Sequence, residues 1–340
     1  MPNTRVVIRE FGGPDVLDVV TDDRLPEPQG SQVRVKVLTT SAAFTDVMIR
    51  KGLYPDVKAR PPFALGYDLV GIVDKPGPDA KRYRPGQRVA DLTTIGAYAE
   101  YVCLPEAELV PVPEDVDPVE AVSVILSFVT PYQMLHRVAK VTEGQRILVH
   151  GAGGAVGTAM LQLARLAHVE AFGTDTITKH DVISELGGVA IDSDPENLEA
   201  RLKAATGGGV DVVFDALGGE SLNRSLHILK PGGMLVAYGF QNMVMGKGGS
   251  IPLDFIKLKL WDLLPNGHAT SFYAIGSMRR HHPEWFKEDL ARMFTLLSQG
   301  KIKPLIARTM PLAEARRAHE LIEAGEAKGK IVLLVGDQTR

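Results

Sequence analysis

Residues 146–166, RILVHGAGGAVGTAMLQLARL, restrict the possible folds of this chain more than any other stretch. An apolar strand, Arg146–His150, leads into a glycine-rich turn and then into Thr158–Ala167, where apolar side chains recur at helical spacing. A bound pyrophosphate needs bare backbone N–H groups with a helix N-terminus behind them, and only glycine permits so tight a turn and so close an approach. A glycine cluster alone would also fit a tight turn between core elements, but this strand–turn–helix context predicts a dinucleotide-binding fold. The predicted phosphate-binding residues are Ala152, Gly153, Gly154, Ala155, Val156 and Gly157.

The second half of the chain alternates apolar strands with helix-like stretches. Such alternation is typical of a doubly wound parallel sheet, so we expect an α/β protein with a Rossmann fold here. A helical segment at Asp254–Leu264 and a sixth strand at Ala269–Ile275 follow, and residues 242–264 are expected to form a lid that shapes a pocket. The strands expected after the first are Val169–Thr174, Val189–Asp192, Asp211–Ala216 and Met234–Gly239.

The first third of the chain has the texture of a β-rich domain. Short β-branched or aromatic runs are separated by Gly and Pro turns. The chain ends in a predicted helix, Leu312–Glu323, and a predicted strand, Lys330–Val335. A length of 340 residues suits two domains. We therefore predict a β-rich catalytic domain at 1–124 with 306–340, and a dinucleotide-binding domain at 125–305. The early strands are expected at Thr4–Ile8, Gln32–Leu38, Leu69–Asp74 and Tyr98–Leu104.

Composition excludes several classes of partner. A formal net charge of −3 gives no basic surface for nucleic acid. A single cysteine allows no internal disulfide and no cysteine-rich metal site, which fits a reducing compartment. The N-terminus lacks the apolar stretch of a signal peptide, and glycines interrupt the uncharged stretch Ile147–Ala164. We expect a cytoplasmic protein that acts on a small molecule and does not insert into a membrane.

Motifs spread over nearly the whole chain occur in the order of one known family. They include Phe44-Thr45-Asp46, Gly66-Tyr67-Asp68-Leu69-Val70-Gly71, Pro85-Gly86-Gln87-Arg88-Val89, Thr130-Pro131-Tyr132-Gln133-Met134-Leu135, Asp215-Ala216-Leu217-Gly218-Gly219 and Gly329-Lys330-Ile331-Val332-Leu333. On these motifs the chain resembles the medium-chain dehydrogenase/reductase superfamily, in its zinc-free quinone oxidoreductase (zeta-crystallin-like) branch. Residues 172–180 most resemble the synaptic-vesicle-protein-like reductases of that branch.

The resemblance implies a GroES-like catalytic domain beside the Rossmann domain, and cofactor contacts at Thr130 and Leu217. Ligands lie at the carboxyl ends of the strands of such sheets, so Tyr238, Gly239 and Phe240 are expected to face the nicotinamide. The expected substrate pocket consists of Phe44, Tyr54, Tyr238 and Phe272. A place in the hydrophobic core is the alternative for the aromatic residues.

We expect no metal. A catalytic zinc needs about three Cys, His or carboxylate ligands. In the zinc-dependent members of the superfamily that the chain resembles, a Cys comes from the loop of Phe44-Thr45-Asp46 and a His from the position of Tyr67. Neither is present here, and Cys103 is isolated in an expected strand.

Without a metal, the reaction is restricted to acceptors that spread incoming charge over a conjugated system, such as quinones and α,β-unsaturated carbonyls. Tyr54 is the candidate catalytic residue, as a hydrogen-bond donor; packing against Pro55 is its alternative role. The branch usually has Asn where Ala43 stands, and its loss favours a second hypothesis, a non-catalytic dinucleotide-binding protein. A third is a reductase of another conjugated acceptor, such as an enoyl thioester.

Neighbouring residues favour different cofactors. The resemblance favours NADPH, with Lys179 as a cation for the 2′-phosphate and the Thr174 hydroxyl as a further contact. Asp175, eighteen positions after Gly157, is near the spacing of the acid that binds the ribose 2′-OH of NADH. Alternatively, Asp175 turns outward and pairs with Lys179 at i+4. NADPH is favoured and NADH is possible.

The resemblance also implies a homodimer. Members of the branch commonly join through the edge of the cofactor-domain sheet, which is Thr270–Ile275 here. An unpaired, apolar edge favours the addition of a strand from another chain.

Overall fold

The computed structural model describes residues 2–194, 196–265 and 267–336. Contacts divide the chain into two compact units: a first unit, Met1–Val129 with Glu284–Arg340, and a second unit, Thr130–Pro283. The expected boundaries differ, because residues 284–305 belong to the first unit. Helix α10 (Pro283–Ser298) runs into that unit, and its last residue, Ser298, donates a hydrogen bond to the Asp115 carboxylate.

The second unit is built on a parallel sheet of six strands in the order β11-β10-β9-β12-β13-β14. The chain starts in the middle of the sheet at β9, adds strands to one side and then to the other. This reversal is the doubly wound arrangement predicted from the alternating pattern. The strands are β9 (Arg146–His150), β10 (Glu170–Asp175), β11 (Val189–Asp192), β12 (Val210–Asp215), β13 (Leu229–Ala237) and β14 (Ala269–Phe272).

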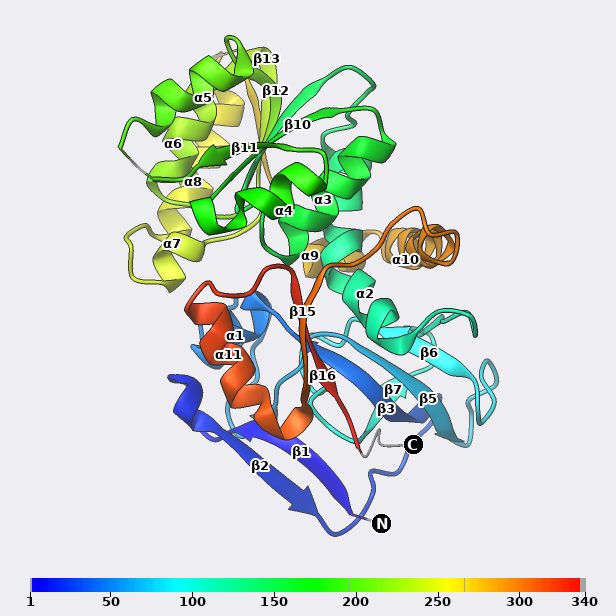
Figure 1. Cartoon of the computed structure of the whole chain (residues 1–340). Helices are drawn as coiled ribbons and strands as arrows, with labels where there is room; N and C mark the ends of the chain where they lie inside the picture. The colour runs from blue at the N-terminus through cyan, green and yellow to red at the C-terminus, as the bar shows by residue number, and fades with distance from the viewer. Residues whose placement is uncertain (1, 195, 266, 337–340) are drawn as a thin grey trace. The chain divides into compact units, whose positions relative to one another are not determined.

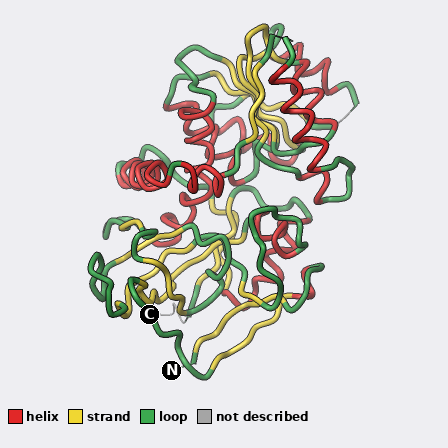
Figure 2. The backbone as a smooth tube through the Cα atoms, turned by 180° about the vertical axis from the view of Figure 1, so that it is seen from behind, coloured by secondary structure: helices red, strands yellow, loops and turns green. Residues whose placement is uncertain are grey.

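Helices cover both faces of this sheet, as Figures 1 and 2 show. On one face lie α3 (Ala155–Leu166), the short turn η3 (Ile177–Lys179) and α4 (His180–Glu185). On the other lie α5 (Leu198–Thr206), α6 (Glu220–His227) and α8 (Ile251–Leu263). The remaining helices of this unit are α7 (Gln241–Val244) and α9 (Ile275–His281).

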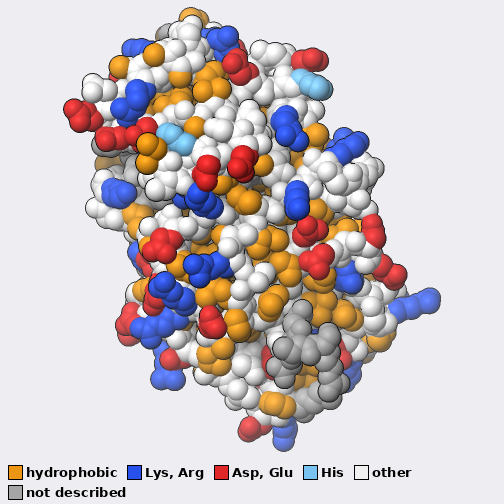
Figure 3. Space-filling view, in the orientation of Figure 1, with side chains coloured by type: hydrophobic (Ala, Val, Ile, Leu, Met, Phe, Trp, Pro, Cys, Tyr) orange, Lys and Arg blue, Asp and Glu red, His pale blue; other side chains and the backbone are white. Residues whose placement is uncertain are grey.

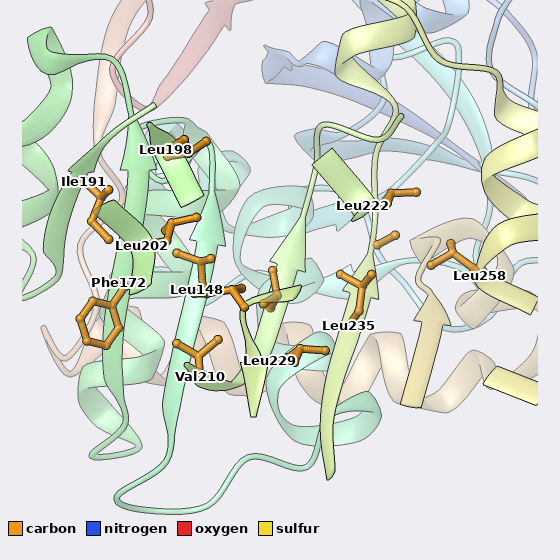
Figure 4. Packing of buried hydrophobic residues seen from close by; sticks show 13 residues of the cluster. Leu148, Phe172, Ile191, Leu198, Leu202, Val210, Leu222, Leu229, Leu235 and Leu258 are labelled. Carbon is orange, nitrogen blue, oxygen red and sulfur yellow. The ribbon is translucent and has the colours of Figure 1, made fainter. Parts of the chain in front are cut away.

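Apolar side chains from the strands and from α5, α6 and α8 form one buried cluster (Figure 4). Burying a large aliphatic side chain stabilises a fold by roughly 1.5–3 kcal/mol. The cluster therefore fixes the sheet against these helices and holds the strand ends in place. Its members include Leu148, Phe172, Ile191, Leu198, Leu202, Val210, Leu222, Leu229, Leu235 and Leu258.

The sixth strand is shorter than expected. β14 ends at Phe272, three residues before Ile275, which begins α9. At Tyr273 the chain turns inward: its backbone N–H bonds the Ala237 carbonyl, and its buried hydroxyl donates to Gln133 Oε1 at 2.8 Å. The Tyr273 N–H makes the last ladder bond to β13 and α9 begins two residues later, so the last strand of the sheet comprises only Ala269–Phe272.

The first unit contains two sheets. A three-stranded sheet has the order β2-β1-β4, and a larger sheet has the order β15-β16-β3-β5-β6-β8, with β7 paired to β3. Only β15 and β16 run parallel; the other pairs are antiparallel. The strands are β1 (Asn3–Ile8), β2 (Leu17–Asp22), β3 (Gln32–Ala42), β4 (Phe63–Ala64), β5 (Leu69–Pro76), β6 (Arg88–Asp91), β7 (Tyr101–Pro105), β8 (Val110–Pro111), β15 (Ile306–Pro311) and β16 (Lys330–Leu334).

Helices α1 (Phe44–Arg50) and α11 (Ala315–Glu323) are joined by a buried polar network, and the turns η1 (Pro14–Val16) and η4 (Leu312–Glu314) flank α11. The buried Arg50 guanidinium donates to Glu323 Oε2 at 2.7 Å and to His319 Nδ1 at 3.4 Å. Burial lowers the pKa of His319 to about 3, so its ring is neutral. Because Nδ1 accepts from Arg50, Nε2 carries the proton and donates to the Tyr98 hydroxyl at 3.2 Å.

Helix α2 (Pro118–Gln133) continues into the π-helical turn η2 (Met134–Val138). Within the described residues, this single stretch of 21 residues is long and apolar enough to cross a membrane, and 78% of its apolar window is buried inside the structure. Burial of this extent is typical of a helix in the core of a protein.

The face of the molecule in Figure 3 carries Lys and Arg side chains interspersed with Asp and Glu.

Candidate active site

The glycine turn and the start of α3 are the segment where the sequence predicts that a phosphate group binds. Helix α3 begins at Ala155, and its N-cap, Gly154, supplies no side-chain hydrogen bond. The first backbone N–H groups of a helix have no intrahelical acceptor, so they stay available to an anion. A Cβ on Gly157 would lie 2.5 Å from both Ala152 Cα and the Gly151 carbonyl oxygen. Only glycine lets the helix pack this closely on the turn.

All six residues predicted for the phosphate loop, 152–157, lie in this turn or in the first turn of α3. Three of their backbone N–H groups already have acceptors, and those of Ala152 and Gly154 donate to the carbonyls of Thr174 and Gly151, each at 3.1 Å. The Gly153 N–H donates to Asp175 Oδ2 at 2.9 Å, and the Lys179 side chain covers Gly153, where an added Cβ would meet it at 2.7 Å. The structure thus places Asp175 and Lys179, which favour different cofactors, against the same loop.

Asp175 ends β10 with its carboxylate directed at the loop. Besides Gly153, it accepts the Thr176 N–H at 2.8 Å, and Lys179 Nζ lies 3.8 Å from Oδ1. The pairing with Lys179 at i+4 is therefore present, but the carboxylate does not turn outward: its side chain is only 11% exposed. Asp175 has a structural partner in the loop backbone that neither sequence hypothesis included.

Thr174, predicted to contact the 2′-phosphate, is buried, and its hydroxyl lies 2.7 Å from the Nδ1 atom of the buried His150. Its backbone carbonyl accepts the N–H groups of Gly151 and Ala152 at 2.9 and 3.1 Å. Thr174 therefore supports the phosphate loop from beneath, and its hydroxyl already has a partner within the protein.

The turn after β12 carries Leu217, a predicted cofactor contact. Asp215 Oδ1 accepts the N–H groups of Leu217 and Gly218 at 2.7 and 3.1 Å. From α8, the buried Asp254 accepts the Gly219 N–H at 2.8 Å. The 242–264 segment, expected to be a lid, is thus bonded to this turn through Asp254.

The turn after β13 contains Tyr238, Gly239 and Phe240. Gly239 lies against the preceding turn, since an added Cβ would be 2.6 Å from the Ala216 carbonyl oxygen. The Phe240 ring is buried and stacks on Phe272 at 5.0 Å. Tyr238 is partly exposed, and its pKa is raised, mainly by desolvation. Tyr238 and Phe272 are thus partly exposed, as expected of pocket residues, whereas Phe240 is part of the core.

Thr130 carries the clearest sign of a missing partner. It is 5% exposed, and its Oγ1 has no hydrogen-bond partner among the described residues. Buried hydroxyls are nearly always bonded in native structures. An orphaned hydroxyl in the unit that holds the phosphate loop fits a bound ligand with a polar group.

In the first unit, Tyr54 and Tyr67 form a hydroxyl pair. Their oxygens are 2.6 Å apart and their rings meet edge to face at 5.8 Å. Tyr67 is buried while Tyr54 is partly exposed. A donor O–H polarised by a second hydroxyl is a stronger hydrogen-bond donor than an isolated tyrosine. The sequence named Tyr54 but missed this support from Tyr67.

Beneath them, Asp46 shapes the loop that contains Phe44. Its carboxylate accepts the Ala43 N–H at 2.9 Å and the Gly66 N–H at 3.2 Å. Burial and, next, the nearby Asp68 raise the pKa of Asp46 to about 7. Phe44 begins α1 and stays partly exposed. The neighbouring Asp68 accepts from the Ser41 hydroxyl and pairs with Lys330.

Comparison with known proteins gives matches over the whole chain. Family models of an alcohol dehydrogenase GroES-like domain and of a zinc-binding dehydrogenase match residues 29–114 and 187–333. The human synaptic vesicle membrane protein VAT-1 homolog-like is 31% identical over 340 residues, covering 96% of this chain and 80% of the relative. A 2-haloacrylate reductase of Burkholderia is 30% identical over 344 residues, covering 96% of this chain and 98% of the relative. The Escherichia coli quinone oxidoreductase, solved with NADPH, superimposes with a TM-score of 0.87 at 27% identity, with 97% and 99% covered.

A doubly wound sheet with a glycine phosphate loop, in one chain with a GroES-like unit, defines the class of medium-chain dehydrogenases and reductases. The chain belongs to this superfamily, in its quinone oxidoreductase-like branch and close to the VAT-1 homologues. The predictions of family and fold class are confirmed. One family model is named for zinc, but among the described residues no three His, Cys, Asp or Glu side chains lie together as a metal site.

Proposed function

We propose that this chain is an NADPH-dependent, zinc-independent reductase that delivers hydride to a quinone or an α,β-unsaturated carbonyl. The observation that carries the proposal is the glycine loop, where Gly157 packs on Ala152 and the uncapped start of α3 leaves backbone N–H groups for an anion. The nicotinamide supplies the hydride when the cofactor is bound. The protein's part is to bind the cofactor, orient it and stabilise charge on the acceptor.

The residues proposed to hold the cofactor belong to the second unit. The N–H groups of 155–157 bind the pyrophosphate, and Lys179 provides the cation for a 2′-phosphate. Thr130 uses its orphaned hydroxyl, and Leu217 with Tyr238, Gly239 and Phe240 lines the nicotinamide side. The complexes of a mycobacterial relative and of the Escherichia coli quinone oxidoreductase with NADPH support NADPH over NADH.

A conjugated acceptor is proposed because the predicted pocket offers hydrogen-bond donors, and no three His, Cys, Asp or Glu side chains lie together among the described residues. Tyr54, backed by Tyr67, donates to the acceptor oxygen as negative charge develops there. The relatives' names point the same way, since quinones and 2-haloacrylates both carry a carbon–carbon double bond conjugated to an oxygen-bearing group. We also propose that the enzyme is cytoplasmic and forms a homodimer.

Two other functions are supported by particular observations. Ala43 in place of the usual Asn favours a non-catalytic dinucleotide-binding protein. Two structural neighbours at 24% identity are an enoyl reductase and an enoyl-reductase-like cyclopropanase, which keeps an enoyl thioester among the acceptors to be tested.

A single assay tests the proposal. The chain is mixed with NADPH or NADH and a panel of quinones, short enals and enoyl thioesters, while cofactor oxidation is followed by absorbance. We expect turnover with quinones or enals and a higher kcat/KM with NADPH. Tight cofactor binding without turnover on any acceptor would establish the binding-protein alternative instead.

The role of Tyr54 is tested with Tyr54→Phe. Loss of one hydrogen bond to the developing negative charge should lower kcat by about tenfold or more. Cofactor affinity should stay unchanged, because Tyr54 lies outside the second unit. Tyr83→Phe is the matched control, since Tyr83 also loses one hydroxyl bond, to the Leu109 carbonyl. Equal kcat values for the Tyr54→Phe variant and wild type would remove Tyr54 from the mechanism.

A further inference from the structure

The ends of three neighbouring strands are linked by one buried chain of hydrogen bonds. Thr174 Oγ1 lies 2.7 Å from His150 Nδ1, and His150 Nε2 lies 3.1 Å from Ser225 Oγ. Ser225 Oγ in turn lies 2.7 Å from Asp215 Oδ2. All four residues are at most 1% exposed. The chain therefore runs from β10 through β9 to α6 and β12 without access to water.

The direction of every hydrogen bond in this chain follows from its Asp215 end. A carboxylate only accepts, so the Ser225 hydroxyl must donate to it. The Ser225 oxygen must then accept from His150, which places the ring proton on Nε2. Nδ1 is left as an acceptor and takes the Thr174 hydroxyl proton. Burial lowers the pKa of His150, which keeps the ring neutral, as this arrangement needs.

Each of the three strands joined by these hydrogen bonds ends in a segment that we assign to cofactor binding. His150 immediately precedes the glycine loop, and Thr174 holds that loop through its carbonyl. Thr174 is also followed by Asp175 and Lys179. Asp215 holds the Leu217 turn through two backbone N–H groups. One hydrogen-bonded unit thus spans three of the cofactor-contacting segments.

We propose that His150 is a positioning residue. It fixes the relative positions of the phosphate loop, the turn from Asp175 to Lys179 and the Leu217 turn, and so prepares them for cofactor binding. This inference rests on the proposed cofactor site. The Thr174 hydroxyl then acts through His150 and makes no contact with the 2′-phosphate, so its loss affects NADPH and NADH alike. The ring is held between two hydroxyl groups, and breaking either contact leaves a buried polar atom unpaired.

Affinity measurements on matched variants test this role. Thr174→Val keeps the volume but removes the donor to Nδ1, Ser225→Ala removes the link to Asp215, and Thr174→Ser keeps the hydroxyl. Thr206→Val is the control, because Thr206 is equally buried and its hydroxyl bonds the Leu202 carbonyl and the Gly209 N–H at the end of α5, away from the carboxyl ends of the strands. Binding of NADPH and of NADH is measured by titration calorimetry on folded proteins.

We expect Thr174→Val and Ser225→Ala to weaken both cofactors by about tenfold, with their affinity ratio unchanged. Thr174→Ser and Thr206→Val should bind both cofactors as wild type does. A loss confined to NADPH would show that Thr174 contacts the 2′-phosphate and would overturn the inference, as would unchanged affinity in Thr174→Val and Ser225→Ala. If wild type binds neither cofactor, the proposed function fails with it; if wild type binds and the variants match it, only this inference fails.

The tautomer provides a readout independent of affinity. Heteronuclear NMR of protein with isotopically labelled histidine distinguishes a protonated ring nitrogen from an unprotonated one, and the signal missing in His150→Gln assigns the residue. We expect the proton on Nε2 in wild type. A proton on Nδ1 would reverse the chain and overturn the inference.

Discussion

At position 157 the loop and helix α3 approach so closely that only a hydrogen atom fits where other residues carry Cβ. Position 154 is less crowded, because a Cβ there would meet only the Gly151 carbonyl oxygen, at 3.3 Å. Two glycines of one motif therefore have different physical reasons. Gly157 permits the packing of helix on loop, and Gly154 leaves the end of the helix open.

We predict that Gly157→Ala lowers NADPH affinity by at least about tenfold, because the loop must shift to relieve the clash with Ala152. Gly154→Ala should cause less distortion of the loop in the cofactor-free protein. Titration calorimetry measures the affinities, and thermal unfolding shows that each variant is folded. Wild-type affinity in folded Gly157→Ala would contradict the assignment of the phosphate loop.

Asp46 gives the stability of the first unit a pH dependence. The folded chain releases this proton near pH 7 and the unfolded chain near the ordinary value of 3.8. Between these values the folded state binds more protons, so stability falls as pH rises. Above the folded value the full cost of the buried charge is present.

We therefore predict that wild type loses stability relative to Asp46→Asn between about pH 5 and about pH 8. The variant cannot ionise at this position, and Asp68 is common to both proteins, so the difference between the two isolates Asp46. Thermal unfolding midpoints at both pH values measure it. Parallel shifts of the two proteins would show that Asp46 does not titrate in this range.

At the scale of elements, α8 and β14 together form an unusual surface. β14 is the last strand of its sheet, and one of its edges has no partner strand among the described residues. Helix α8 packs on β14 and turns apolar side chains to solvent. Contiguous apolar surface beside an open sheet edge is typical of a subunit interface. The exposed apolar residues along and just after α8 are Leu253, Ile256, Leu260, Leu263 and Leu264.

We predict that the chain is a homodimer of about twice 36.8 kDa by light scattering, joined through β14 and this face of α8. Leu263, 80% exposed, would be buried in the dimer, so Leu263→Glu should give a monomer. Val19→Glu, at an exposed apolar residue on β2, is the control and should remain dimeric. A monomeric wild type at micromolar concentration would refute the proposed interface.

At the scale of the whole molecule, the positions of Tyr67 and Cys103 bear on whether the protein needs a metal ion. Tyr67 stands where zinc-dependent relatives have a ligand, and its hydroxyl bonds Tyr54. Cys103 lies in β7, and burial raises the pKa of its thiol, which disfavours the thiolate that binds metal. These side chains serve packing and hydrogen bonding.

We predict full activity after exhaustive chelation and no stoichiometric zinc by elemental analysis. Binding of a structural metal would contribute directly to folding, so the thermal unfolding midpoint should also be unchanged. Activity lost on chelation and restored by zinc alone would contradict this prediction.

Local sequence patterns were enough to predict the architecture. The strand–glycine–helix motif and the alternating pattern predicted the Rossmann sheet, because helical periodicity and glycine sterics act over a few neighbouring residues. For the same reason residues 152–157, predicted to bind phosphate, were placed together in the turn and the first turn of α3, where the structure has them. The end of β14 was predicted less well: the strand ends at Phe272, and the next side chain, Tyr273, bonds the distant Gln133, a contact that local periodicity does not encode.

What only the tertiary structure decided depends on residues far apart in the chain. His150 meets Thr174 and Ser225 across 24 and 75 positions, and this contact, not local sequence, directs the Thr174 hydroxyl inward. The Asp175 carboxylate bonds Gly153 across 22 positions, and residues 284–305 join the first unit through contacts such as Ser298 with Asp115. Such pairings follow from which strands lie side by side, and sequence periodicity carries no information on which polar atoms then meet.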